Sequence, residues 1–311
     1  MQHPHQHPSP LKGVVAPVIT PFDEALDPDP VRFAEICAWL LRSGCTGLAP
    51  FGTTSEANSL STQERIDLLE AAVKAGVDAS RLVPGTGCCS VTETALLSRH
   101  AMETGCAGVM TLPPFYYKGA SDEGLYRYFA SLIERVGDAR LKIYLYHIPP
   151  IAQVPLSHEL VTRLVGDFPE VVVGLKDSSG DWHYTEGLLG KLPGFGAFFG
   201  SEERLLATLN AGGAGCISAT ANVNAAGIRA VWDAWGTPRA DSLQASASAV
   251  RRAIAHHPLI PAVKYLLAHY LRDPGLVRVR PPLTAFSEEK GRALVETLER
   301  DCAFGLEEAL S

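Results

Sequence analysis

Short apolar runs alternate with amphipathic segments along the chain from about residue 14 to residue 218. Apolar runs bounded by turn residues are typical of parallel strands that are buried on both faces. The segments between them carry apolar residues at helical spacing. Eight such strand–helix units, with no long linker, predict a closed α/β TIM (β/α)8 barrel rather than an open sheet. The expected strands are 14–19, 47–50, 82–84, 107–112, 141–146, 171–176, 195–199 and 215–218.

Capping residues mark several of the expected helix boundaries. Ser61 is followed three positions later by Glu64, which forms the pattern of a capping box. Three further helical patterns follow the barrel, at 242–255, 261–269 and 287–301. An eighth strand–helix unit needs only one helix, so we expect a C-terminal helical extension. The predicted division is a disordered tail over 1–10, the barrel over 11–222, and the last barrel helix with the C-terminal helical region over 223–311.

The strand 171–176 carries the most informative chemistry because it ends on a lysine, Lys176. Strict alternation places Val172, Gly174 and Lys176 on one face, so the amine would have room beside a glycine. An apolar setting disfavours the ammonium form, and a neutral amine can attack a carbonyl to form a Schiff base. The alternative, from this strand alone, is that Lys176 caps the strand and reaches solvent.

Composition and charge exclude several classes of function. The formal net charge of −7 is spread without acidic or basic blocks, so we expect no nucleic-acid and no membrane partner. The seven cysteines match no zinc or disulfide framework and indicate a cytoplasmic protein. A catalytic cysteine at Cys88 or Cys89 lacks a supporting histidine. No dense group of His, Asp and Glu predicts a metal site.

In a barrel of this type the loops that follow the strands converge on one mouth, where active sites lie. Tyr146 ends the strand before that of Lys176, so the two should be neighbours, and a phenol can relay protons to an amine. Gly52, Thr53 and Thr54 form a small-residue loop whose backbone N–H and hydroxyl groups can approach a carboxylate. A core tyrosine and an ordinary helix approach are the respective structural alternatives.

Taken in order, Gly52-Thr53-Thr54-x-Glu56, Tyr146-x-x-Pro149 and Gly174-x-Lys176 resemble the dihydrodipicolinate synthase / N-acetylneuraminate lyase family. The resemblance extends from Val14 to Asn222. It implies a TIM barrel with C-terminal helices, a class I aldolase that forms a lysine Schiff base with pyruvate or a similar 2-oxo acid, no cofactor, and a homotetramer built as a dimer of dimers.

The same resemblance implies roles for individual residues. Lys176 matches the Schiff-base lysine, Tyr146 the proton-shuttling tyrosine, Thr53 the hydroxyl of the relay, and Thr54 the clamp on the pyruvate carboxylate. The second relay tyrosine, which comes from a neighbouring subunit, matches Tyr116, although a one-residue gap would select Tyr117 instead. The remaining substrate-binding positions that the resemblance implies are Gly52, Ile217 (through its backbone carbonyl), Ser178, Glu202 and Ile151.

Three departures from the family pattern bear on the substrate. Ser55 replaces a usual glycine and His147 a usual asparagine. Ile151 stands where the lysine-biosynthesis synthase carries an arginine for the second substrate's carboxylate, and an apolar side chain cannot replace a bidentate guanidinium. The chain is therefore not expected to be that synthase. Glu202 and Glu203 near the mouth would suit a hydroxylated substrate tail better than a second carboxylate.

Several functions share this set of residues. A lyase that cleaves or forms a C–C bond through the Schiff base is the reading that we favour. A dehydratase or hydratase-aldolase would use the same imine, and a barrel that only binds small acids would need no proton relay. A pyridoxal-phosphate enzyme would need a phosphate cradle after strands seven and eight, where two glutamates stand instead.

Overall fold

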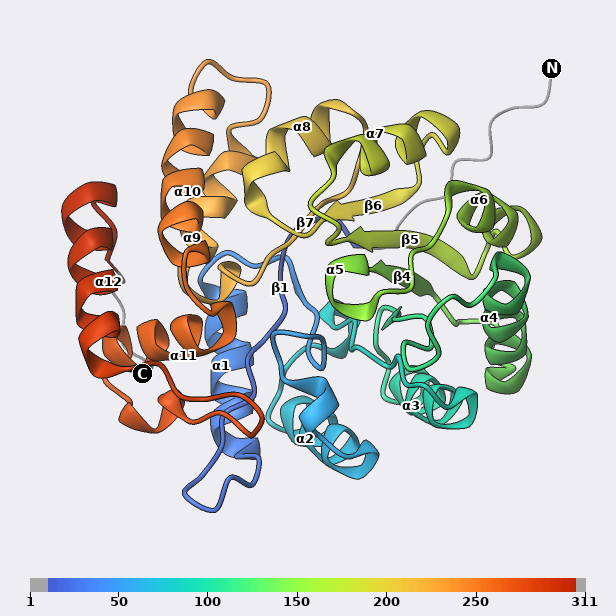
Figure 1. Ribbon diagram of the computed structural model, residues 1–311, viewed down its shortest axis with the longest axis horizontal. Helices are drawn as coiled ribbons and strands as arrows, with labels where there is room; N and C mark the ends of the chain where they lie inside the picture. Colours follow the sequence, from blue (N-terminus) through green and yellow to red (C-terminus); the bar gives the residue numbers. More distant parts are fainter. Residues whose placement is uncertain (1–10, 306–311) are drawn as a thin grey trace.

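The computed structural model describes residues 11–305, and the predicted tail over 1–10 lies outside the described residues. Within this range, parallel strands curl around a common centre with helices outside them (Figure 1). The strand order is β2-β1-β7-β6-β5-β4-β3. The strands are β1 Gly13–Ala16, β2 Gly47–Leu48, β3 Val109–Thr111, β4 Ile143–His147, β5 Val172–Asp177, β6 Gly196–Phe199 and β7 Gly215–Ile217.

The segment 82–86 closes the gap between β2 and β3, although it is not a regular strand. It forms only isolated bridges, Leu48 to Leu82 and Gly85 to Met110. Its backbone nevertheless bonds on both sides: the N–H of Val83 donates to the Leu48 carbonyl at 2.8 Å, and the N–H of Met110 donates to the Pro84 carbonyl at 2.9 Å. Pro84 has no N–H to continue the ladder, which accounts for the irregularity of the predicted strand 82–84. The predicted barrel is confirmed.

Each strand is followed by at least one helix on the outer side of the barrel. The capping box at the start of α2 is present, with the Glu64 carboxylate accepting from the Ser61 N–H at 2.7 Å. After β6, a 3-10 turn over Glu202–Arg204 precedes α8. The barrel helices are α1 Pro30–Arg42, α2 Thr62–Lys74, α3 Val91–Glu103, α4 Asp122–Val136, α5 Pro149–Ala152, α6 His158–Asp167, α7 Trp182–Lys191, α8 Leu205–Asn210 and α9 Ala221–Asp233.

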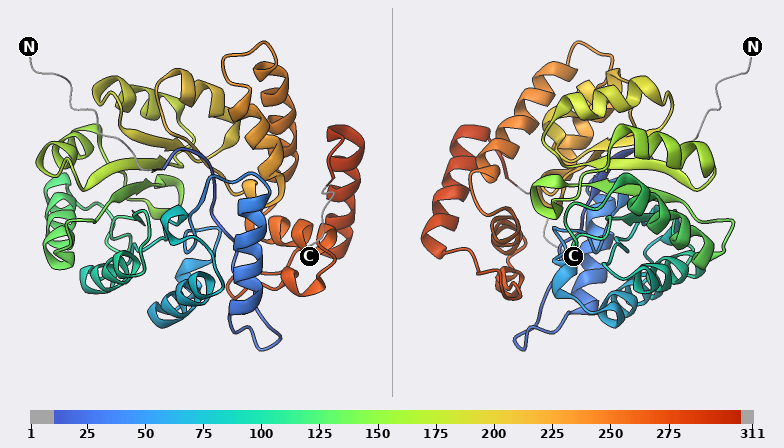
Figure 2. Two further views of the ribbon diagram at one scale, coloured as in Figure 1. Left: turned by 180° about the vertical axis from the view of Figure 1, so that it is seen from behind. Right: turned by 45° about the vertical axis from the view of Figure 1, so that its right-hand side comes forward.

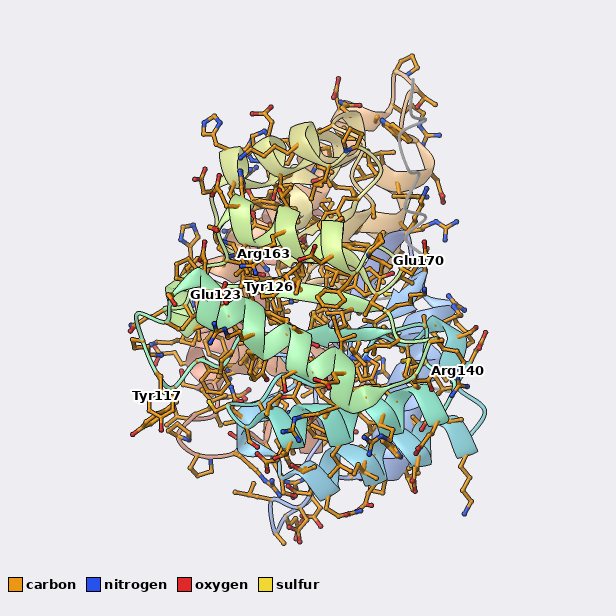
Figure 3. The ribbon with its side chains drawn as sticks, turned by 90° about the vertical axis from the view of Figure 1, so that its right-hand side faces the viewer. Tyr117, Glu123, Tyr126, Arg140, Arg163 and Glu170 are labelled. Atoms are coloured by element: carbon orange, nitrogen blue, oxygen red, sulfur yellow. The ribbon has the colours of Figure 1, made fainter. Side chains whose placement is uncertain are left out.

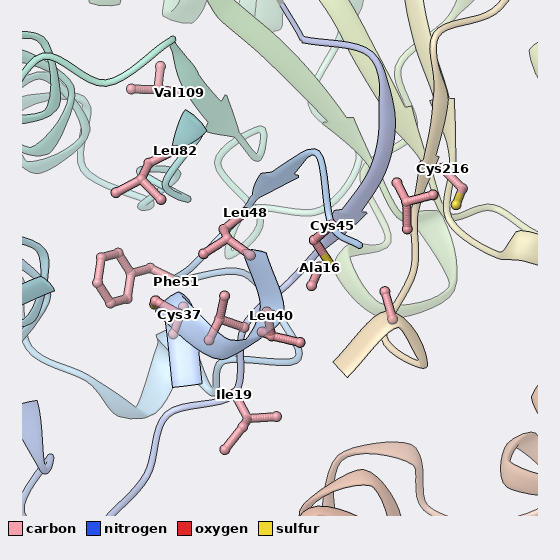
Figure 4. Close-up of a cluster of buried hydrophobic side chains, with 14 of the residues drawn as sticks. Ala16, Ile19, Cys37, Leu40, Cys45, Leu48, Phe51, Leu82, Val109 and Cys216 are labelled. Atoms are coloured by element: carbon pink, nitrogen blue, oxygen red, sulfur yellow. The ribbon is translucent and has the colours of Figure 1, made fainter. Parts of the chain in front are cut away.

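Two apolar clusters form the core. The larger one fills the space between the strands and the surrounding helices, and Figure 4 shows part of it, with Leu40 and Cys37 of α1 beside Leu48 and Ala16. The smaller cluster fills the inside of the barrel, and it includes Tyr144, Tyr146 and Ile217. Helix and sheet faces that pack in this way supply most of the stability of such a domain.

The C-terminal helices α10 Ala240–Ala255, α11 Leu259–Tyr270 and α12 Glu288–Cys302 follow the barrel. They stand together beside α9 and α1, on one side of the molecule (Figure 2). The predicted extension is confirmed, whereas the exact division at residue 222 stays a prediction. Among residues 11–305, no helix is long and apolar enough to cross a membrane.

The alternation predicted for β5 is wrong at its first residues. The register against β4 shifts between Ile143 and Tyr144. Val172 therefore belongs to the outer cluster and Val173 to the inner one, the reverse of the prediction. A bulge inserts one extra residue, and beyond it the side chains alternate again. Lys176 faces the inside of the barrel, against the ring of Tyr146.

Gly174 also has a different role from the one predicted. A Cβ at this position would lie 2.4 Å from the Gly196 carbonyl oxygen and 2.5 Å from the ring of Tyr144. The absent side chain thus makes room for the Tyr144 ring and the neighbouring strand, not for the Lys176 amine.

Candidate active site

Tyr146 and Lys176 lie directly opposite each other on the adjacent strands β4 and β5. The Lys176 Nζ atom lies 4.3 Å from the centroid of the Tyr146 ring. Both residues are buried, with exposed fractions of 2% for Tyr146 and 4% for Lys176. A buried amine against an aromatic face is shielded from bulk water, which is the setting that a nucleophilic lysine needs.

Thr53 joins this pair from the loop after β2. Its hydroxyl lies 3.1 Å from the Tyr146 hydroxyl, within hydrogen-bond distance, and either oxygen can donate. The Thr53 hydroxyl, the Tyr146 phenol and the Lys176 amine thus form a row of neighbouring polar groups. Such a row can pass a proton to or from a group that reacts at the amine.

The loop that carries Thr53 has an unusual backbone. Phe51 and Glu56, at its two ends, both have left-handed conformations, with φ of 60° and 56°. The backbone at Phe51 can pack closely against the segment 82–86 because that segment has a glycine at position 85. A Cβ on Gly85 would lie 2.0 Å from the Phe51 carbonyl oxygen. Left-handed residues other than glycine persist only where the surroundings hold them.

Ser55 and Thr20 hold the middle of this loop. The Ser55 hydroxyl donates to the Val18 carbonyl, and the Gly52 N–H lies 3.3 Å from the same hydroxyl oxygen. The Thr20 hydroxyl donates to the Ser55 carbonyl at 2.7 Å. The serine that departs from the family pattern therefore ties the loop to the segment after β1.

Thr54 and Ile217 are both buried, Thr54 in the same loop and Ile217 at the end of β7. Ile217 belongs to the inner cluster together with Tyr146. Ser178 follows β5 and is half-buried, and its N–H donates to the His147 carbonyl at 2.7 Å. All three positions therefore lie at the strand ends, as predicted, and their roles toward a substrate stay predictions.

The two glutamates after β6 differ from each other. Glu202 is fully buried, and its carboxylate accepts hydrogen bonds from the Ser218 and Thr220 hydroxyls. Glu203 turns toward α10, where it lies 3.2 Å from the guanidinium of Arg252. Both carboxylates thus have partners within the chain, and their availability to a hydroxylated substrate stays a prediction.

Tyr116, Tyr117 and Ile151 lie on the surface. Their exposed fractions are 74%, 77% and 63%. The two tyrosine rings meet edge to face with centroids 5.4 Å apart, and Figure 3 shows Tyr117 at the outer edge of the molecule. Within one chain the structure therefore brings Thr53, Tyr146 and Lys176 together and leaves Tyr116 outside this group.

His147 and Asp177, which directly follow Tyr146 and Lys176, anchor β4 and β5 to α7. His147 stacks on Tyr184 with ring centroids 4.0 Å apart, and its Nδ1 accepts from the Leu156 N–H at 3.1 Å. Burial lowers the pKa of His147 to about 4. Asp177 accepts from the Thr185 hydroxyl at 2.6 Å, and burial raises the pKa of its carboxyl.

Lys264 of α11 is a second fully buried lysine that the sequence reasoning did not select. It forms an ion pair with Glu56 of the Thr53 loop, and both side chains are at most 1% exposed. Desolvation lowers the pKa of Lys264 to about 8, while the Glu56 charge opposes that shift. The sequence does contain an indication of this burial. The neighbours of Lys264 within Pro261–Ala268 are nearly all apolar, so this helix has no polar face on which the lysine could lie.

Comparisons with known proteins agree with this geometry. The family model described as the dihydrodipicolinate synthetase family matches residues 10–301. A DapA-like lyase of Chloroflexus aurantiacus, itself described as uncharacterized, is 34% identical over 93% of this chain and 96% of its own length. A 4-hydroxy-tetrahydrodipicolinate synthase of Agrobacterium fabrum is 30% identical over 92% of this chain and 96% of its own.

Two solved structures are similar over nearly their whole length. The dihydrodipicolinate synthase of Agrobacterium tumefaciens has 32% identity and a TM-score of 0.85, covering 92% of this chain and 98% of that one. The chloride-inhibited dihydrodipicolinate synthase of Acinetobacter baumannii, complexed with pyruvate, has 25% identity and a TM-score of 0.84, covering 94% and 99%. This chain therefore belongs to the dihydrodipicolinate synthetase family and is a lyase of the class I aldolase type, which acts through a lysine Schiff base.

Proposed function

We propose that Lys176 is the Schiff-base lysine and that pyruvate, or a 2-oxo acid that yields it, is the imine-bound partner. The observation that carries this proposal is the buried Lys176 amine over the Tyr146 ring, with the Thr53 hydroxyl bonded to the same phenol. The amine nitrogen attacks the ketone carbon to give a carbinolamine, which loses water to give an iminium. In cleavage, a base removes the proton of the C4 hydroxyl, the C3–C4 bond breaks to release an aldehyde, and the iminium accepts the electron pair of that bond to become an enamine; condensation reverses these steps.

Tyr146 and Thr53 move the protons in this scheme. The carbinolamine hydroxyl must receive a proton before it leaves as water, and Tyr146, whose ring lies against the amine, is the proposed donor. Thr54 and the backbone N–H groups of the Gly52 loop would bind the carboxylate of the 2-oxo acid. Ile217, through its carbonyl, would face the bound acid from the end of β7.

A homotetramer, arranged as a dimer of dimers, completes the proposed site. Tyr116 lies outside the buried group of its own chain, so a role in the relay requires that it enter the site of a second copy. Exposed apolar side chains at Tyr116, Tyr117 and Ile151 support an interface here, since large exposed apolar groups gather where proteins associate. The cytoplasmic location expected from the sequence stays a prediction.

The second substrate is proposed to differ from that of the lysine-biosynthesis synthase. Ile151 is an exposed residue of α5 and offers no hydrogen-bond donor in its side chain to a carboxylate. Ser178 and Glu202 are the proposed contacts for the tail of the second substrate. An imine-based dehydratase or hydratase-aldolase uses the same residues, and product analysis separates it from an aldolase.

Borohydride trapping tests the proposal directly. The protein is incubated with pyruvate and sodium borohydride, and its intact mass is measured beside that of Lys176→Ala. Lys191→Ala is the matched control, because Lys191 is an exposed lysine at the end of α7. A reduced pyruvate adduct on the parent protein and on Lys191→Ala, but not on Lys176→Ala, is the expected result. No adduct on folded parent protein would refute the aldolase and favour a barrel that only binds small acids.

A further inference from the structure

The ion pair between Glu56 and Lys264 connects the Thr53 loop to the C-terminal extension. One oxygen of the Glu56 carboxylate accepts from the Lys264 ammonium, and the other accepts from the backbone N–H of Arg280 at 2.9 Å. Both donors belong to the extension, 208 and 224 residues further along the chain. Because both oxygens are bonded, the position of the carboxylate is fixed entirely from outside the barrel strands.

Glu56 in turn fixes the backbone of Thr53. The Glu56 N–H donates to the Thr53 carbonyl at 3.1 Å, which closes a tight turn. Glu56 holds a left-handed conformation, which is unfavourable for a residue with a side chain, so something must hold it there. The buried ion pair is well placed to do so, because neither charge can move into water without a large rearrangement.

The extension is also held to the barrel by contacts that do not involve Glu56. The guanidinium of Arg280 bonds the Glu64 carboxylate of α2 at 2.6 Å, and it donates to the Leu26 carbonyl at 2.7 Å. The Lys264 ammonium also lies 4.4 Å from the centroid of the Phe22 ring, in the segment after β1. Figure 1 shows the segment between α11 and α12 reaching toward α1 and α2. Glu64 thus serves the same segment without touching the Thr53 loop.

We propose that Glu56 is a positioning residue, through which Lys264 and Arg280 of the C-terminal extension hold the Thr53 hydroxyl against Tyr146. This inference rests on the proposed role of Thr53 in the relay. Glu56 itself touches neither Lys176 nor Tyr146 through any hydrogen bond of the described residues, so its effect passes through the loop backbone. The extension is therefore part of the site and not only a cover for the barrel.

The test compares Glu56→Gln with Glu64→Gln, two neutralised carboxylates that face the same segment. Two quantities are measured for each: the rate of imine trapping at saturating pyruvate, and deuterium uptake of peptides covering residues 51–57. Glu56→Gln is expected to slow trapping at least about tenfold and to speed exchange in these peptides. Glu64→Gln is expected to lower the melting temperature while trapping stays within about twofold of the parent. Glu56→Asp, which keeps the charge, should recover part of the trapping rate and provides the test if Glu56→Gln does not fold.

The outcomes separate this inference from the proposed function. Parental trapping and exchange in a folded Glu56→Gln or Glu56→Asp protein would overturn the inference while the imine chemistry stands. An equal loss of trapping in Glu64→Gln would also overturn it, because the effect would then be one of general stability. If the parent protein itself traps no pyruvate, the proposed function fails, and the exchange data alone decide whether Glu56 holds the loop.

Discussion

Stability toward acid should depend on His147, the residue directly after the proposed relay tyrosine. Its ring is 3% exposed, stacks on Tyr184, and accepts a hydrogen bond at Nδ1 from the Leu156 N–H. A second proton would have to enter at Nδ1, where the N–H of Leu156 already points. The folded protein therefore holds a neutral imidazole, and burial together with the charge of His158 lowers the pKa of His147 to about 4.

The sign and the size of the effect follow from this pKa. In the unfolded chain the imidazole titrates near 6.5, so between pH 6.5 and 4 the unfolded chain binds a proton that the folded chain does not. The contribution of the neutral His147 ring to the free energy of unfolding is therefore fully present above pH 6.5 and is lost as the pH falls toward 4. At about 1.4 kcal/mol for each pKa unit, His147 alone removes about 3 kcal/mol of the free energy of unfolding by pH 4.

Urea denaturation at half-unit pH steps from 7.5 to about 4, at one fixed protein concentration, measures this loss. His147→Asn is the matched variant, because its side-chain oxygen can accept from the Leu156 N–H and does not titrate. The variant loses the stack on Tyr184 and should be less stable at pH 7, by about 1 kcal/mol. Between pH 6.5 and 4, its free energy of unfolding should fall by about 3 kcal/mol less than that of the parent protein. Equal acid slopes for parent and variant would refute the argument.

Three further predictions concern the site and its strands. Tyr146→Phe should slow imine trapping by about 10²–10⁴ without unfolding the protein, and a parental rate would exclude the phenol from the relay. Gly174→Ala should lower the free energy of unfolding by about 1–3 kcal/mol, because its Cβ would lie 2.4 Å from the Gly196 carbonyl oxygen; an unchanged urea midpoint would contradict this. Mixed oligomers of Tyr116→Phe and Lys176→Ala should regain activity that neither variant has alone, and confirmed hetero-oligomers that stay inactive would exclude Tyr116 from acting across subunits.

The order of the strands and helices could be predicted because each strand–helix unit is determined by residues close together in the sequence. Hydrophobic period, turn residues and caps such as Ser61 are all short-range signals, and the barrel follows from their repetition. The adjacency of Tyr146 and Lys176 followed from the same rule, since consecutive parallel strands are usually neighbours. The shared face of Gly174 and Lys176 was predicted because the alternation is regular from Gly174 onward.

What the sequence could not provide depends on contacts between distant segments. The bulge that exchanges Val172 and Val173 arises from the register between β4 and β5, which no single strand encodes. The ion pair of Glu203 with Arg252 could not be predicted, because the two residues are 49 positions apart. Lys264 stands out only as a charge among apolar residues, and nothing local identifies Glu56 as its partner.

The pair of Glu56 and Lys264 also has a consequence for the order in which the chain is made. Ribosomal synthesis proceeds from the N-terminus, and Glu56 emerges 208 residues before the lysine that neutralises it. Until α11 has left the ribosome, a carboxylate destined for a fully buried place has no cation beside it, and burying it alone is unfavourable. We therefore expect the Thr53 loop to reach its final buried form only after α11 docks.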